Sequence, residues 1–319
     1  MHYLITGGAG FIGSHLAESL IAAGHEVAVI DDLSTGSLKN LAAVRDHRRL
    51  HFLKGDIADC PELESLVADA DSVFHLAAAV GVDLVIKNPV RTIETNVHGT
   101  EEVFKHAGRH NTQVILASTS EVYGRADNPL FRETDDLLIG PPTHFRWSYA
   151  ASKALDEYLA LAYHKENKLK PVIARLFNTV GPRQTGKYGM VLPRFVQQAL
   201  SNEPVTVYGD GEQTRCFCHV HDTVRALIAL ERTQTAIGQI FNIGSQHSVS
   251  INELAELVLA ETDSESERRH IPYDKAYEPG FEDMHRRMPA IDKIREYTDW
   301  EPFIPLAQVI QDVIAEHRS

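Results

Sequence analysis

A glycine-rich turn near the start of the chain most constrains its fold. The segment TGGAGFIG, residues 6–13, lies between a short apolar run and an amphipathic, helix-like segment. In a dinucleotide-binding turn one glycine permits the tight bend, one lets the backbone approach a pyrophosphate, and one allows close helix packing. Glycine clusters also form ordinary loops, but this position between strand and helix favours the binding turn. We therefore predict dinucleotide contacts at Gly7, Gly10, Phe11, Ile12 and Gly13.

Short apolar runs alternate with longer helix-like segments through the first half of the chain. The runs are residues 3–6, 27–30, 51–53, 73–77, 114–117 and 172–176. This alternation predicts an α/β fold, a doubly wound parallel sheet of the Rossmann type with helices on both faces. The clearest helix is expected over residues 11–23, with Gly24 as its stop.

After Asn178 the sequence becomes rich in glycine and turn formers, with amphipathic stretches at 191–200 and 251–260. We expect a smaller α/β substrate-binding lobe there. A strand-like stretch at 238–244 should return to the sheet, so the lobe would be discontinuous. The predicted domains are 1–178 plus about 216–244 for the dinucleotide, and about 179–215 plus 245–319 for the substrate. The charged segment 261–269 is expected to be a solvated loop.

Composition excludes several classes of protein. The 319 residues carry a net charge of −13, which disfavours nonspecific binding of nucleic acids and anionic membranes. The start of the chain has no signal-peptide pattern, and no apolar run approaches the about 18 residues that span a bilayer. We expect a cytoplasmic location. Three cysteines, Cys60, Cys216 and Cys218, fit neither a disulfide framework nor a four-ligand zinc site, and we expect no metal.

Carboxylates follow the second and third apolar runs. Asp31 stands where a carboxylate would accept hydrogen bonds from an adenosine ribose, which favours NAD over NADP because a 2′-phosphate would meet negative charge. Asp32 is the alternative for this role, or an ordinary loop residue. Asp56, with Ile57, is a candidate for the adenine edge or, equally, for a helix N-cap.

Tyr149 and Lys153 are four residues apart in a segment with helical periodicity, which puts a phenol and an ammonium on one face. A free tyrosine has a pKa near ~10, and a fixed cation nearby favours the phenolate. The pair is therefore a candidate acid/base for a sugar hydroxyl.

The motifs TGGAGFIGSHL, GDIAD, VFHLAA, STSEVYG, YAASK and RLFNTVGPRQ together resemble the extended short-chain dehydrogenase/reductase family of nucleotide-sugar epimerases, dehydratases and decarboxylases. The resemblance covers nearly the whole chain. It implies a tightly held NAD, a nucleotide-sugar substrate, and a triad of Thr119, Tyr149 and Lys153. The further cofactor contacts that we expect are Leu76, Ala77, Ala78 and Asn96.

The pair Ser120 and Glu121 bears on the reaction. A carboxylate two residues past the triad threonine suggests chemistry at C5 or C6 of the sugar, as in GDP-mannose dehydratases and UDP-glucuronate decarboxylases. The stretches 137–153 and 209–217 resemble decarboxylases acting on UDP-glucuronate. Arg215 matches an arginine with a role in decarboxylation or protonation there, and elsewhere in the family one that grips the diphosphate; both roles stay open.

The resemblance implies a specific reaction for a UDP-glucuronate decarboxylase. Tyr149 takes the C4 hydroxyl proton as the hydride passes to NAD, leaving a ketone β to the carboxylate, and carbon dioxide then leaves. Return of the hydride gives UDP-xylose, whereas escape of the intermediate gives a UDP-4-keto-pentose. Residues 79–83, AVGVD, depart from the Ser-Pro-Pro-x-Tyr pattern of UDP-xylose synthases, so a UDP-sugar 4-epimerase is the alternative. A 4,6-dehydratase comes third. A dinucleotide-binding sensor is the alternative without catalysis.

Family position also suggests how the UDP-sugar is held. Asn178, Arg215 and Arg287 are candidates for the diphosphate, and Val207 and Tyr208 for the uracil, with Val191 as a further contact. Lys87 is expected near the edge of the sugar and nicotinamide, although a solvated lysine is the simpler interpretation. His75 and His219 are expected to be buried and hydrogen-bonded rather than ligands. The apolar faces of helices near 90–107 and 149–163 predict a homodimer through a four-helix bundle, although they would equally suit a buried helix.

Overall fold

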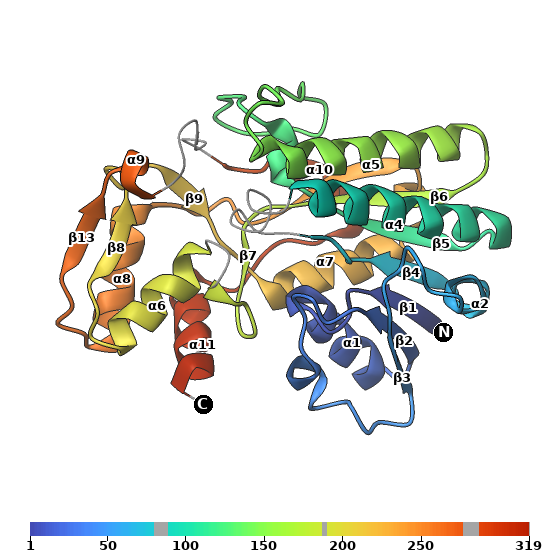
Figure 1. Cartoon of the computed structure of the whole chain (residues 1–319), viewed down its shortest axis with the longest axis horizontal. Coiled ribbons are helices and arrows are strands. Elements are labelled where there is room, and N and C mark those ends of the chain that lie inside the picture. Colours follow the sequence, from blue (N-terminus) through green and yellow to red (C-terminus); the bar gives the residue numbers. More distant parts are fainter. Residues whose placement is uncertain (80–88, 187–189, 277–286, 319) are drawn as a thin grey trace.

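A seven-stranded parallel sheet forms the centre of the computed structural model, which describes residues 1–79, 89–186, 190–276 and 287–318 (Figure 1). The strand order is β11-β6-β5-β4-β1-β2-β3. The strands are β1 (His2–Thr6), β2 (Glu26–Asp31), β3 (Leu50–Lys54), β4 (Ser72–His75), β5 (Gln113–Thr119), β6 (Lys170–Leu176) and β11 (Gln239–Ile243). All seven coincide with predicted runs, and the doubly wound α/β fold is confirmed. The central strands are apolar on both sides because helices cover both faces.

Helices from distant parts of the sequence cover the two faces. One face is packed by α1 (Phe11–Ala22), α7 (Val220–Arg232) and α10 (Asp292–Thr298). The other carries α2 (Leu63–Asp69), α4 (Pro89–His110) and α5 (Trp147–Lys165), with α4 and α5 side by side (Figure 1). Short 3-10 segments lie at η1 (Leu38–Leu41), η2 (Ser120–Tyr123) and η4 (Gln234–Ala236).

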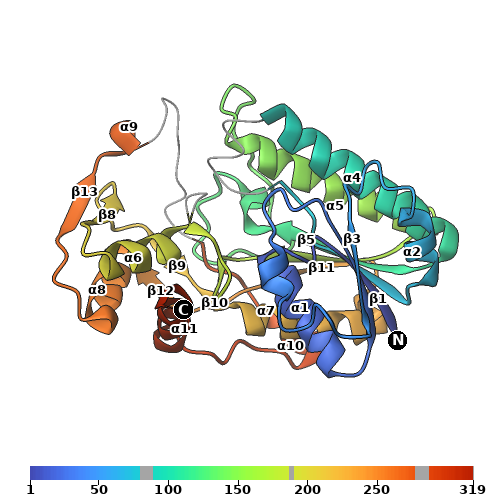
Figure 2. The ribbon, with the colours of Figure 1, turned by 60° about the horizontal axis from the view of Figure 1, so that its bottom comes forward.

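A second lobe lies beside the carboxyl edge of the sheet and has its own apolar core (Figures 1 and 2). Its helices are α6 (Val191–Leu200), α8 (Ile251–Thr262), α9 (Tyr273–Ala276) and α11 (Leu306–Arg318). Its strand pairs are β8 (Val205–Tyr208) with β13 (Arg268–Ile271) and β9 (Thr214–Cys216) with β12 (Ser248–Ser250). The pair β7 (Thr179–Val180) with β10 (Cys218–His219) lies between sheet and lobe. A capping box at Ser250 and Glu253 starts α8, because each side chain bonds the other residue's backbone amide.

Two predicted boundaries are corrected. The helix α10 belongs to the sheet domain, since Ile291, Ile294 and Trp300 pack into the core beneath the sheet, whereas the sequence placed all of 245–319 in the lobe. The predicted loop 261–269 ends in strand β13, because Arg268 and Arg269 pair with β8. Among the described residues, no helix is long and apolar enough to cross a membrane.

Candidate active site

The glycine turn between β1 and α1 has the shape that a pyrophosphate site needs. Gly7 has φ +71°, and a Cβ there would lie 2.8 Å from the amide nitrogen of Ala77. A Cβ on Gly13 would collide with the carbonyl oxygen of Gly7, whereas one on Gly10 would meet only that oxygen, at 3.1 Å. The three glycines thus serve the turn, the helix packing and the open approach separately, and the amino end of α1 supplies the positive dipole end for an anion.

Asp31 ends β2 next to this turn and is 8% exposed. Its carboxylate accepts hydrogen bonds from the amides of Ala9, at 2.9 Å, and Leu33, at 2.8 Å. Burial raises its pKa, and these two amides oppose that effect. Asp32 accepts from the Ser34 amide and approaches Arg91 at 3.5 Å, which suits the alternative of a loop residue. Asp31 is therefore the better placed acceptor for a ribose.

The other predicted cofactor residues differ in what they can offer. Asp56 accepts a bond from the Ala58 amide in a turn, so the alternative of a helix N-cap is wrong, because α2 starts only at Leu63. Ile57 is buried against Gly99, which leaves its backbone for any cofactor contact. Leu76, Ala77 and Ala78 follow β4 and are partly buried.

Thr119 ends β5 and Tyr149 begins the first turn of α5, and their side chains hydrogen bond to each other. Burial raises the pKa of Tyr149, and the negative charges of Glu121 and Asp156 raise it further. The pKa is raised overall, although the nearby cation Arg287 lowers it. The Lys153 ammonium, which was expected to lower this pKa, lies 2.9 Å from the carboxylate of Asp156.

Glu121 lies in an arginine cluster, which we define as Glu121 with Arg146, Arg215 and Arg287. The Arg287 guanidinium lies 3.0 Å and that of Arg146 3.9 Å from the Glu121 carboxylate. Burial alone would raise the pKa of Glu121, but the charges of Arg287, Arg146 and Arg215 lower it overall. Glu121 is thus held as a carboxylate beside Tyr149.

Sequence reasoning did not assign a role to Arg146. Its side chain is almost wholly buried, and its guanidinium lies over the ring of Trp147, 4.6 Å from the centroid. Its position three residues before Tyr149, one turn back along the helix, was the available signal. Ser120, predicted to act with Glu121, is buried at the start of η2.

The predicted nucleotide contacts fall on both lobes. The Asn178 amide donates to the carbonyl of Cys216 at 3.2 Å, which ties the end of β6 to the lobe. The Val207 side chain is fully buried in the lobe core, so only its backbone can meet a base. Tyr208 is covered by the Arg194 guanidinium at 4.0 Å, and Val191 is the first, half-buried residue of α6. Residues 80–83 and Lys87 lie outside the described residues.

His75 and His219 are both buried, as the sequence predicted. His75 bonds Thr6 at 2.7 Å and Thr100 at 2.9 Å, as expected for a satisfied core histidine. His219 is also buried and approaches Asp312 at 3.2 Å. The three cysteines are free thiols.

Comparison with known proteins gives the family. The family model described as GDP-mannose 4,6 dehydratase matches residues 4–313. A UDP-N-acetyl-alpha-D-glucosaminuronate decarboxylase of Bacillus cytotoxicus is 41% identical, covering 99% of this chain and 97% of that protein. UDP-glucuronic acid decarboxylase 1 of Arabidopsis thaliana is 36% identical over 100% of this chain and 70% of its own length.

Solved structures agree. The UDP-glucuronic acid 4-epimerase of Bacillus cereus, solved with UDP-glucuronic acid and NAD, superposes with a TM-score of 0.89 at 28% identity, covering 100% of this chain and 99% of that one. The family is NAD-dependent, in accord with the cofactor predicted from the glycine turn and Asp31. The chain belongs to the GDP-mannose 4,6-dehydratase family of extended short-chain dehydrogenases/reductases, whose members are nucleotide-sugar decarboxylases, epimerases and dehydratases.

Proposed function

We propose that this chain is an NAD-dependent UDP-glucuronate decarboxylase that forms UDP-xylose. The observation that carries the proposal is the arginine cluster beside Tyr149, in which three guanidiniums surround one carboxylate. Guanidiniums bind carboxylates through paired, charge-assisted hydrogen bonds, so a substrate carboxylate suits this cluster better than the neutral C6 hydroxyl of UDP-glucose.

Neighbouring side chains have distinct roles in this proposal. Tyr149 takes the proton of the C4 hydroxyl. Thr119, whose side chain hydrogen bonds to that of Tyr149, would also hydrogen bond to the C4 oxygen. The resulting C4 ketone is β to the carboxylate on C5, so the electron pair that the C5–C6 bond leaves behind when carbon dioxide departs is held as an enolate. In this proposal Arg215 helps to return a proton to C5, and Glu121 with Ser120 orients the carboxylate.

NAD supplies the hydride acceptor at C4 and, after carbon dioxide has left, the donor. The glycine turn and Asp31 would hold its pyrophosphate and adenosine ribose, because the turn leaves space at Gly10 and the carboxylate has further lone pairs. Lys153 would hold the nicotinamide ribose. The protein's own contribution is to orient the substrate and to move the proton at Tyr149.

UDP-N-acetylglucosaminuronate is the second candidate substrate. The relative that bears this activity in its name is 41% identical over nearly the full length of both chains. The two substrates differ only in the group on C2, and the same C4 oxidation and loss of carbon dioxide would apply to both.

Proton NMR of the purified protein with NAD and each nucleotide sugar tests the proposal. We expect UDP-glucuronate to give carbon dioxide and a pentose spectrum, with no conversion of UDP-glucose or GDP-mannose. A pentose product formed only from the N-acetylated uronate would establish the second candidate. An equilibrium mixture of C4 epimers with all carbons retained would refute decarboxylation and establish a 4-epimerase.

We also propose that two copies associate through α4 and α5. These adjacent helices expose Val90, Leu155 and Tyr158, which are 66%, 50% and 68% accessible. Large apolar side chains gathered on one pair of helices suit a bundle with a second copy. Light scattering should give twice the chain mass, and Tyr158→Glu should reduce it to that of a monomer; a monomeric wild type would refute this association.

A further inference from the structure

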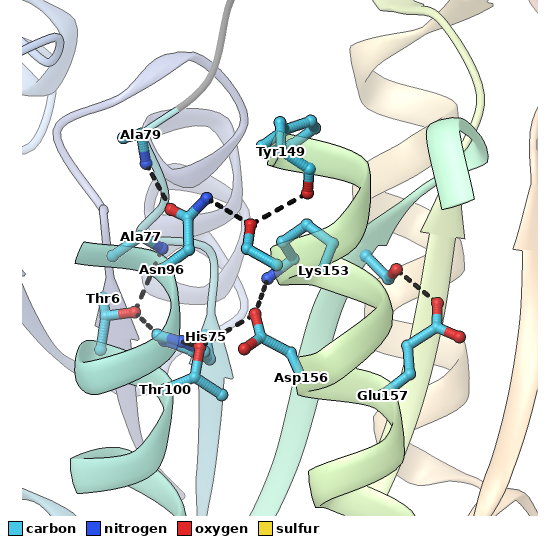
Figure 3. A network of polar contacts seen from close by, with 12 residues as sticks. Thr6, His75, Ala77, Ala79, Asn96, Thr100, Tyr149, Lys153, Asp156 and Glu157 are labelled. Atoms are coloured by element: carbon cyan, nitrogen blue, oxygen red, sulfur yellow. Dashed lines mark hydrogen bonds and ion pairs between the residues drawn. The ribbon is translucent and has the colours of Figure 1, made fainter. Parts of the chain in front are cut away.

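Lys153 and Asp156 form a buried ion pair within α5. The ammonium lies 2.9 Å from one carboxylate oxygen, and the two residues are 1% and 0% exposed (Figure 3). They are three residues apart and share one face of the helix. The only polar contacts that the structure gives the Asp156 carboxylate use this one oxygen; the other makes no hydrogen bond among the described residues. We call this pair the lysine pair.

The lysine pair is anchored to the neighbouring helix. The Thr100 hydroxyl of α4 donates to the same Asp156 oxygen at 3.2 Å and lies 2.9 Å from Nε2 of His75. His75 ends β4, and burial together with the charge of Lys153 lowers its pKa to about 3. The imidazole therefore stays neutral and relays hydrogen bonds without adding a charge to the site.

The same chain of contacts ends at the segment after β4, where contacts to the cofactor are predicted. Nδ1 of His75 lies 2.7 Å from the Thr6 hydroxyl at the end of β1, and this hydroxyl accepts a bond from the Ala77 amide at 3.3 Å. Figure 3 shows the continuous path from Asp156 through these side chains to Ala77. The position of the ammonium is thus fixed relative to the backbone after β4.

A second bridge runs parallel to the first. The Asn96 side chain of α4 accepts from the Ala79 amide at 2.8 Å and donates to the Ser152 hydroxyl at 3.1 Å. Ser152 in turn donates to the carbonyl of Tyr149 at 2.9 Å. Asn96, predicted to contact the cofactor, links the segment after β4 to the helix that carries the acid/base. Two bridges therefore fix α5 against the segment after β4, but only the first includes charged side chains.

We propose that Asp156 is a positioning residue, which holds the Lys153 ammonium as a charged group at a fixed place relative to the segment after β4. Through this ammonium, Asp156 sets the pKa of Tyr149. The proposal rests on the roles proposed for Tyr149 and Lys153 in oxidation at C4. It does not depend on the fate of the substrate carboxylate, because decarboxylation, epimerisation and dehydration all begin with this step.

Asp156 can influence Tyr149 by two routes of opposite sign. Its own negative charge raises the pKa of Tyr149 directly, as does that of Glu121, whereas Arg287 opposes them. By keeping the Lys153 side chain charged, Asp156 preserves a cation that favours the phenolate of Tyr149 when this ammonium acts in the active site. The negative charge of Glu157, the next residue, also raises the pKa of Asp156. The Glu157 carboxylate is itself paired with Arg175 at 2.7 Å.

The test is the pH dependence of turnover in Asp156→Asn, measured with whichever nucleotide sugar the wild type converts. Without a counter-ion, the buried Lys153 favours its neutral form, so we expect the acid limb of activity to move to higher pH by about one unit, a shift worth about 1.4 kcal/mol. We expect binding of NAD, followed by protein fluorescence, to weaken roughly tenfold. Asp156→Glu should restore part of both.

Asp222→Asn is the matched control. Asp222 is also wholly buried on a helix, and it lies 2.9 Å from Arg225 at the same spacing of three residues, but it belongs to neither the lysine pair nor the arginine cluster. Its loss should lower the melting temperature and leave the pH profile and NAD affinity unchanged.

Three results would overturn the proposal. A limb that moves to lower pH would show that Asp156 acts directly on Tyr149 by its charge. An unmoved limb, or a profile that Asp222→Asn shifts equally, would leave Asp156 a merely structural role. If Asp156→Asn does not fold, Thr100→Val removes the bond at 3.2 Å and should give a smaller shift in the same direction; an unmoved limb there would likewise refute the proposal.

Discussion

Two buried charge clusters flank Tyr149, and they are built differently. The arginine cluster gathers its side chains from η2, the residue before α5, β9 and the segment after residue 286, so it spans both lobes. The lysine pair comes from one helix and is anchored by its neighbour. One cluster holds three cations around one carboxylate, and the other holds one of each sign. The lysine pair is almost completely buried, and its two charges neutralise each other. The two clusters therefore suit different roles: guanidiniums from several elements suit an anionic ligand, and a pair within one helix suits the positioning of a side chain.

The largest expected effect comes from the residue between the clusters. Tyr149→Phe removes the proton acceptor for the C4 hydroxyl and keeps the ring, so turnover should fall by about 10³-fold. NAD binding should be retained, because the glycine turn is untouched. Single-turnover absorbance of the reduced cofactor measures the loss, and undiminished activity would refute the assigned base.

The next effect tests whether the arginine cluster binds a uronate. Arg287→Ala removes the guanidinium 3.0 Å from Glu121 and should lower kcat/KM for UDP-glucuronate by about 10²-fold, within the range for breaking a buried charge pair. Arg268→Ala is the control, since its pair with Glu256 at 2.6 Å is more exposed and lies away from the site. Equal losses in the two variants would contradict a role in substrate binding.

A smaller effect separates the two clusters by sign. Glu121→Gln removes a charge that raises the pKa of Tyr149, so the acid limb of activity should move to lower pH by roughly half a unit, opposite to Asp156→Asn. A limb that moves upward in both variants would erase the distinction between the clusters.

Glu121 also contributes to stability with a defined pH dependence. Its folded pKa lies below the unfolded value of about 4.3, so its contribution is present above that pH and is lost as the pH falls through the folded pKa. The stabilities of wild type and Glu121→Gln should therefore differ above about pH 4.3 and converge as the pH falls through the folded pKa, as measured by thermal unfolding. A stability difference that persists in acid would contradict the ion pairing of Glu121.

The smallest effect lies outside both clusters. Ser250→Ala removes the capping box of α8 and should lower the free energy of unfolding by about 1 kcal/mol. The pH profile should not move, because α8 supplies no member of either cluster. A changed profile in this variant would show that lobe stability, rather than local charge, controls the acidity of Tyr149.

The sheet and the glycine turn could be predicted because their signals are local. Apolar runs of strand length and glycines three apart are written in contiguous sequence, and both correspond to elements of the structure. The partners of Glu121 and Lys153 could not be predicted with equal ease. Arg287 is 166 residues from Glu121, and the helical spacing of Lys153 fits Tyr149 as well as Asp156. Tertiary packing decided that the ammonium turns toward the interior.

The order of strands has a consequence for synthesis of the chain. The edge strand β11 is made roughly 60 residues after its neighbour β6, and the intervening chain belongs mostly to other elements. At a translation rate of about 5–20 residues per second, β6 waits on the order of 3–12 s for this partner. During that interval the unpaired backbone edge of β6 is open to pairing with other nascent chains. The ribosome therefore delivers the sheet incomplete, and β11 covers the edge of β6 only after the other six strands have been made.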